Sequence, residues 1–104
     1  MIYEVTIAVD PASAPEYAAW LRQHVLQVLA NDGFSRAEIM RADPPTGDRR
    51  AHFVVHYTVR DRASLQAYFD DPGPTGAAAL RSDGLTRFAD RMAASRRILE
   101  PLEP

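Results

Sequence analysis

Cysteine, lysine and long hydrophobic runs are all absent from this sequence of 104 residues. Without cysteine the chain has no disulfide framework, no thiol nucleophile and no thiolate metal ligand. No segment approaches the ~20 consecutive apolar residues of a membrane-spanning helix. The first 20 residues also lack the basic start and the apolar stretch of a secretory signal. We therefore expect a soluble cytoplasmic protein that has no contact with a membrane.

A basic excess is missing as well. All 12 basic residues are arginine, and they stand against 14 acidic residues, which leaves a formal net charge of −2. Proteins that bind nucleic acid usually carry a clear basic excess, so we expect no nucleic-acid partner. What is present is a composition typical of a folded protein, with 46% hydrophobic residues. A chain of this length forms one compact domain, residues 1–104, and is too short for two.

Four segments show the alternation of apolar and polar residues that is typical of β-strands. They are Ile2–Val9, Phe34–Ala42, Ala51–Arg60 and Met92–Glu100. In the second segment two choices of buried face stay open, because Phe34 and Met40 have the opposite parity to Ile39. A loop rich in proline, glycine and aspartate separates the second segment from the third and predicts a hairpin.

Apolar residues at helical spacing follow the first strand. The residues that share one face of this helix are Tyr17, Trp20, Leu21, His24, Val25, Val28 and Leu29. We expect Ser13 to be the N-cap, because its hydroxyl can accept a backbone hydrogen bond, and Pro15 suits the first turn. The helix should end near Ala30, since Asn31–Gly33 has the composition of a helix stop.

The segment between the third and fourth strands is also helical, but it is interrupted. Asp61 is expected to cap a helix whose inner face includes Tyr68. Asp71–Pro74 is rich in turn residues and breaks this helix. We then expect a short helical piece over Thr75–Arg81 and one more turn over Leu85–Phe88.

The resulting order, β-α-β-β-α-β, predicts a ferredoxin-like α+β sandwich. Right-handed crossovers place the first and third strands in the centre of a four-stranded antiparallel sheet. The helices then cover one face of this sheet and leave the other uncovered. The uncovered face carries Glu4, Thr6, His52, Val54 and His56. A mixed face of this kind commonly packs against a second copy, so we expect a homodimer through this sheet face, with a barrel at its centre.

RNA-recognition modules share this order of elements. In those modules the third strand carries a glycine and exposed aromatic residues that stack on bases. The corresponding segment here, Arg49–Val54, has no glycine, and Phe53 has the parity of the helix-facing side. Together with the missing basic excess, this departure argues against RNA binding.

Residues along nearly the whole chain resemble one known family. They are Trp20–Val25, Leu29, Gly33, Phe34, Val55–Tyr57, Leu65, Tyr68, Leu80, Arg81, Gly84, Leu85, Arg87–Asp90 and Ser95–Leu99. On these residues the chain resembles an uncharacterised bacterial family, a domain of unknown function grouped with the dimeric α/β-barrel proteins. That group includes cofactor-free monooxygenases of antibiotic biosynthesis, small isomerases and haem-degrading enzymes. The resemblance implies the fold and a dimer, but no particular reaction. The sequence departs most at Asp71–Gly76, where a more continuous helix is expected.

His24 is the residue most informative about chemistry. It lies one helical turn after Trp20 on the apolar stripe, so it should point toward the sheet. A histidine in this position is more often a hydrogen-bonded core residue. The functional alternative is a general acid or base at the bottom of a pocket between helix and sheet, with Tyr57 of the third strand as its phenol partner. The resemblance implies that ligands bind in this same cleft.

The sequence therefore predicts one cavity with His24 and Tyr57 as catalytic candidates. The candidate ligand contacts are Trp20, Tyr68, Arg81 and Phe88. Arg81 should lie near the mouth, where its guanidinium can bind a carboxylate of a small molecule. The expected function is that of a cofactor-free enzyme, similar to a monooxygenase or an isomerase, acting on a small aromatic or cyclic molecule. The alternative is a dimer that binds a small ligand or serves in assembly without catalysis.

Neither a metal nor a cofactor is expected. His52 and His56 lie four residues apart on one strand, ~13 Å at the usual rise, whereas one ion needs both imidazoles at ~2.1 Å. Hydrogen bonds across the dimer interface explain these two histidines more simply. The glycines between residues 73 and 84 match neither dinucleotide-binding nor phosphate-loop spacing.

Overall fold

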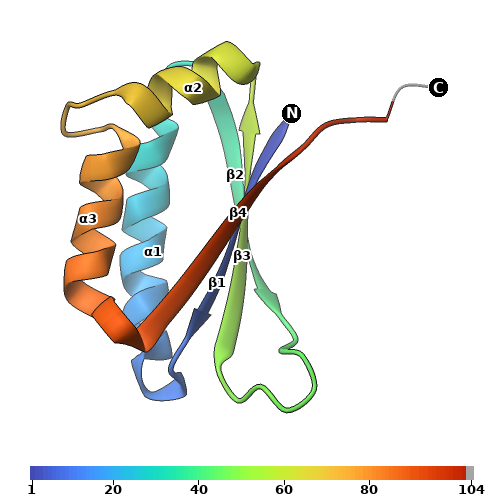
Figure 1. Ribbon diagram of the computed structural model, residues 1–104, viewed down its shortest axis with the longest axis vertical. Coiled ribbons are helices and arrows are strands. Elements are labelled where there is room, and N and C mark those ends of the chain that lie inside the picture. Colours follow the sequence, from blue (N-terminus) through green and yellow to red (C-terminus); the bar gives the residue numbers. More distant parts are fainter. Residues whose placement is uncertain (103–104) are drawn as a thin grey trace.

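The computed structural model describes residues 1–102, in which the helices lie on one side of a single β-sheet (Figure 1). Its elements are β1 (Ile2–Val9), α1 (Ala14–Leu29), β2 (Phe34–Ala42), β3 (Ala51–Val59), α2 (Arg62–Asp70), α3 (Ala77–Phe88) and β4 (Met92–Leu99). Short 3-10 turns at Pro11–Ser13 and Ala89–Arg91 lead into α1 and β4. Within the described part of the chain, no helix has the length and apolarity needed to cross a bilayer.

The sheet has the order β2-β3-β1-β4, and its neighbouring strands are antiparallel. β1 and β3 occupy the centre, with Tyr3 directly opposite Tyr57. On its other side β1 pairs with β4, where Tyr3 lies opposite Ile98. This arrangement confirms the predicted ferredoxin-like fold, and β3 and β4 each end one residue earlier than predicted.

The core fills the space between the sheet and the helices. The sheet contributes the side chains of the predicted inner parity, among them Tyr3, Ile7, Phe53, Val55, Tyr57 and Val59, each at most 5% exposed. The stripe on α1 that faces them includes Tyr17, Leu21, Val25 and Val28, which are also buried. Burial of each such side chain contributes roughly 1.5–3 kcal/mol, so this single layer holds the helices on the sheet.

The open question about the buried face of β2 is resolved by a β-bulge. The pairing with β3 shifts between Phe34 and Arg36, so one residue between them is left unpaired. Phe34 lies opposite Val59, and Ile39 lies opposite Val55, so both take the side of the sheet that faces the helices. The bulge resets the alternation, and this is why a strict period of two could not accommodate both residues.

The chain between Ala77 and Phe88 differs from the prediction. We expected two helical pieces, but α3 runs without interruption through Gly84. A glycine inside a helix costs only about 1 kcal/mol relative to alanine, and here it permits a close contact with α1. The break at Asp71–Pro74 is confirmed, and it separates α2 from α3.

Both predicted N-cap residues occupy the N-cap position, but only Asp61 makes the cap hydrogen bond. The carboxylate of Asp61 accepts a hydrogen bond from the backbone N–H of Ser64 at 2.8 Å. Ser13 makes no cap hydrogen bond, because the preceding 3-10 turn already places it in helical backbone geometry. Its hydroxyl instead accepts a hydrogen bond from Arg91 at 3.1 Å, which joins the start of α1 to the start of β4.

Candidate functional site

A cavity of about 330 Å³ lies between the sheet and helices α1 and α3. Its volume is at the lower end of the range of small-molecule sites, roughly 300–1,000 Å³. Aromatic rings from strands and helices form much of its wall: Tyr3, Tyr17, Trp20, Tyr57 and Tyr68. The cavity is therefore large enough for a small molecule and has a largely aromatic wall.

Most of the predicted site residues meet at this cavity. Those that line it are Trp20, His24, Tyr57, Tyr68 and Arg81. Phe88 is not among the lining residues, because it is fully buried behind the wall. Its ring contacts that of Tyr17 edge to face, with centroids 4.8 Å apart. Phe88 thus packs against a residue of the wall and does not face the cavity.

The indole of Trp20 is held between α1 and α3. Its ring stacks on the imidazole of His24, with centroids 4.6 Å apart and planes 19° from parallel. Its Nε1–H donates to the carboxylate of Asp83 at 2.6 Å. The indole also lies so close to Gly84 that an added Cβ would be 2.6 Å from a ring carbon. Asp83 and Gly84 together therefore set the position of the indole against α3.

His24 lacks the hydrogen bond that a structural core histidine would make. Its Nδ1 is buried and has no partner among residues 1–102. Burial lowers the pKa of His24 to about 4, and the positive charge of Arg96 contributes to the same shift, against a smaller opposing effect of Asp83. The imidazole is therefore neutral at pH 7, and its buried Nδ1 stays without a hydrogen bond in the described chain.

Three tyrosines of the cavity, Tyr17, Tyr57 and Tyr68, stay protonated. Burial raises the pKa of Tyr17 and of Tyr68 to about 12, and it raises that of Tyr57 further. The ring of Tyr57 stacks on that of Tyr3, with centroids 5.8 Å apart. These phenols can therefore donate a hydrogen bond to a ligand, but they cannot act as bases near neutral pH.

Two guanidinium groups belong to the lining, one from a helix and one from an edge strand. Arg81 of α3 donates to the hydroxyl of Tyr3 at 2.9 Å. Arg96 of β4 lies opposite Val5, on the side of the sheet that faces the helices. Sequence reasoning did not single out Arg96, although its period-two parity with Ile98 was a usable signal.

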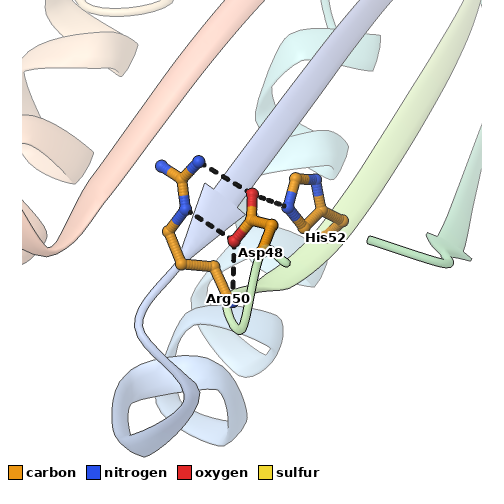
Figure 2. Close-up of polar contacts among 3 residues, drawn as sticks. All are labelled: Asp48, Arg50 and His52. Carbon is orange, nitrogen blue, oxygen red and sulfur yellow. Dashed lines mark hydrogen bonds and ion pairs between the residues drawn. The ribbon is translucent and has the colours of Figure 1, made fainter. Parts of the chain in front are cut away.

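Each of the two histidines of the uncovered sheet face contacts a carboxylate of its own chain, and the expected hydrogen bonds across an interface stay a prediction. His52 contacts the carboxylate of Asp48 at 2.9 Å, and Arg50 donates to the same carboxylate (Figure 2). The Arg50 guanidinium holds the pKa of Asp48 far below its usual range. His56 contacts Glu4 at 2.6 Å. No group of three or more metal-ligating side chains occurs in the described part of the chain.

The carboxylate of Glu4 also joins two strands of the uncovered face. Arg97 of β4 donates to it at 2.5 Å, on the opposite oxygen to the one that His56 contacts. The hydrogen bond from Arg97 lowers the pKa of Glu4 below its usual value. The Glu4 side chain exposes only 10% of its surface. A buried charge of this kind is tolerated because both of its oxygens are paired.

Several solved structures have the same fold. An EthD family protein from Bacillus halodurans superposes with a TM-score of 0.66 at 14% identity, over 96% of this chain and 100% of that one. SnoaB, a cofactor-independent oxygenase from Streptomyces nogalater, superposes with a TM-score of 0.65 at 15% identity, over 99% of this chain and 94% of that one. A DABB family protein with a ferredoxin-like fold from Mesorhizobium loti superposes with a TM-score of 0.63 at 20% identity, over 98% of each chain. At these identities the likeness establishes the fold alone.

Sequence comparison identifies the family of the chain as a domain of unknown function. No curated protein matches the chain. A family model described as a domain of unknown function, DUF4286, matches residues 1–102. The match spans every helix and strand of the described chain and every residue that lines the cavity. It also agrees with the predicted resemblance to an uncharacterised family. The chain therefore belongs to the DUF4286 family.

Proposed function

We propose that this chain is a cofactor-free enzyme that binds a small aromatic or cyclic molecule in the cavity and takes a proton from it with His24. The observation that carries this proposal is a neutral imidazole in the lining of an aromatic cavity, whose Nδ1 has no partner among the described residues. Aromatic walls favour a planar ring, through offset stacking and edge-to-face contacts. A neutral imidazole within reach of that ring is a proton acceptor.

The chemistry starts at a C–H bond next to a ring carbonyl. The imidazole of His24 accepts the proton, and the electron pair of the C–H bond becomes an enolate. Tyr57 donates a hydrogen bond to the enolate oxygen, and the guanidinium groups stabilise its charge. Return of the proton to another carbon completes an isomerisation. Alternatively, O₂ oxidises a ring CH₂ to a ring carbonyl. One oxygen atom enters the carbonyl and the other leaves as water with the two hydrogens, so no external reductant is needed. The fold shared with a cofactor-independent oxygenase supports this second outcome.

A second candidate function is binding without catalysis. It is favoured by the pKa of His24 itself, since an imidazole with a pKa of about 4 is a weak base at neutral pH. In this case His24 would accept a hydrogen bond from the ligand and would not take its proton. The two candidates predict the same ligand in the same cavity, so only proton transfer separates them.

Deuterium exchange separates the two candidates. The enzyme should accelerate exchange of the α-protons of 1-tetralone, a bicyclic enolisable ketone, with D₂O, as followed by NMR. His24→Ala should lose roughly 10²- to 10⁴-fold of this acceleration. Gln23→Ala, on the exposed side of the same helix, is the matched control and should exchange at the wild-type rate. Saturable binding of 1-tetralone without accelerated exchange would favour the second candidate and refute catalysis.

The proposal includes a homodimer that forms through the uncovered sheet face. No helix covers this face within the described chain (Figure 1). Its central strands carry Thr6, Val54 and Ala8, which are less polar than a surface that stays in water. The paired charge of Glu4 adds little cost to burial, because its oxygens already have partners.

A further inference from the structure

The charged residues that line the cavity are of one sign. Arg81 and Arg96 are the ionised side chains of its lining, and no carboxylate of residues 1–102 is among the lining residues. This contrasts with the chain as a whole, whose formal net charge is −2. The nearest acidic residue along α3, Asp83, is already occupied by Trp20 and Arg87. The cavity is thus a local region of positive potential.

Neither arginine forms an ion pair in the described chain, but Arg81 donates a hydrogen bond to Tyr3, whereas the Arg96 guanidinium has no hydrogen-bond partner there. Its neighbour Arg97 points to the other face of the sheet and binds Glu4. Arg96 makes no ion pair with any carboxylate in the described chain, although it lies at the rim of an aromatic cavity. A guanidinium without an acidic partner gains most from an anion that arrives with the ligand.

The positive field reaches the interior of the cavity. The charges of Arg96 and Arg81 both lower the pKa of His24, and both oppose the effect of burial on the pKa of Tyr68. His24 lies on α1 and Tyr68 on α2, so the two guanidinium groups act across the whole width of the cavity. A negative charge placed beside Arg96 and Arg81 would be attracted, and a positive charge there would be repelled.

We infer that the ligand of this cavity is an aromatic carboxylate: a planar ring among the aromatic walls, with its carboxylate bound by Arg96 and Arg81 at the rim. The planar fork of a guanidinium matches the two oxygens of a carboxylate. A neutral ring would leave both guanidinium groups without a counter-charge. This inference rests on the proposed function, because it concerns the substrate class of the same cavity.

A pair of probes with the same shape tests the charge. 2-Naphthoate and 2-naphthamide differ in charge but hardly in size, and their binding can be measured by calorimetry. We expect wild-type protein to bind 2-naphthoate roughly 10- to 100-fold more tightly than 2-naphthamide, the effect of a hydrogen bond to a charged group. Arg96→Gln should remove most of this preference, and Arg96→Lys should restore part of it.

Arg22→Gln is the matched control, since it removes one positive charge from the exposed side of α1. It should leave both affinities unchanged. Equal affinity of the two probes for wild-type protein would overturn the inference and leave the proposed function intact. An equal loss of preference in Arg22→Gln and Arg96→Gln would also overturn it, because attraction would then come from net charge alone. If folded wild-type protein bound neither probe, both the inference and the proposed cavity function would fail.

Discussion

At the scale of single residues, His24 illustrates how surroundings determine chemistry. The same side chain on an exposed helix face would have a pKa near 6.5 and would change its charge near neutral pH. In this fold it lies under the indole of Trp20, with Arg96 and Arg81 acting on it from β4 and α3 and Asp83 opposing them. The result is an imidazole that stays neutral throughout the physiological range and can accept a proton or a hydrogen bond from a ligand.

The pKa of His24 can be measured through its neighbour. Trp20 is the single tryptophan of the chain, and a protonated imidazole in ring contact quenches indole emission. We expect Trp20 emission to fall with a midpoint near pH 4 as the pH is lowered. His24→Gln should abolish this transition. Asp83→Asn should keep the transition but move its midpoint to lower pH, because the Asp83 charge raises the pKa of His24. A midpoint near 6.5 would contradict the burial of His24.

The same shift makes stability depend on pH. The pKa of His24 is about 4 in the folded state and about 6.5 in the unfolded state, so the unfolded chain binds more protons between these values. The free energy of unfolding should therefore decrease as the pH falls from 6.5 to 4, by at most about 3 kcal/mol from this residue. Urea unfolding across this window measures it.

His24→Gln is the comparison for this measurement. Its free energy of unfolding should vary less between pH 6.5 and pH 4 than that of the wild type, because the variant has no imidazole to protonate. The carboxylates are the same in both proteins, so their contribution to the pH dependence cancels in the comparison. Identical pH profiles for the two proteins would show that His24 has an ordinary pKa.

At the scale of elements, the contact between α1 and α3 depends on Gly84. An alanine there would gain roughly 1 kcal/mol of helix propensity. Its Cβ would, however, lie 2.6 Å from the indole of Trp20, so the ring would have to move. We expect Gly84→Ala to lower the free energy of unfolding by about 1–2 kcal/mol net, the cost of overpacking less the gain in propensity. Thermal unfolding measures this change.

Ser82→Ala provides the matched control on α3. Ser82 is exposed, so its replacement gains helix propensity without a clash and should leave the protein as stable or slightly more stable. Gly84→Ala should also shift the emission maximum of Trp20, whereas Ser82→Ala should not. If Gly84→Ala were the more stable of the two variants, the indole would not be held where the structure places it.

Sequence reasoning predicted every strand and the order of the elements, because the period-two and helical patterns are local. It did not predict the bulge after Phe34, since one unpaired residue leaves no clear mark on the pattern. It divided α3 into two pieces, one ending at Arg81 and one beginning at Leu85, because the reason for the glycine between them is a contact with Trp20, 64 residues earlier in the sequence.

The predictions about the candidate site succeeded where local parity sufficed and failed where tertiary packing decided the position. Trp20, His24 and Tyr57 were selected from the inward parity of their own helix or strand, and each lines the cavity. The position of Phe88 depends instead on where α3 ends relative to α1. The exposure of Arg96 to the cavity depends on β4 being an edge strand that the helices only partly cover. These are tertiary facts that no local pattern contains.

At the scale of the whole molecule, the uncovered sheet face makes a homodimer the expected assembly. Val54 lies in the middle of this face, opposite Thr6 on β1 and Met40 on β2. Val54→Asp would place an unpaired carboxylate in the interface, and burying such a charge is costly. We expect wild-type protein to scatter light as two chains at micromolar concentration and Val54→Asp as one.

Thr86→Asp is the control for the dimer, because it adds the same charge on the exposed side of α3. It should remain dimeric. A wild-type mass equal to that of one chain would contradict the dimer. So would a Val54→Asp variant that keeps the wild-type mass while remaining folded.

The central claim is that the cavity beside His24 is a ligand site, and the indole N–H of Trp20 reports on it most directly. With one tryptophan in the chain, a ¹⁵N-labelled sample gives a single indole N–H resonance, from a ring that lines the cavity. We expect this resonance to shift saturably on titration with 2-naphthoate, and to shift far less at the same probe concentrations in Arg96→Gln. A resonance that stays in place at millimolar 2-naphthoate, in a protein whose other resonances show it to be folded, would contradict the claim.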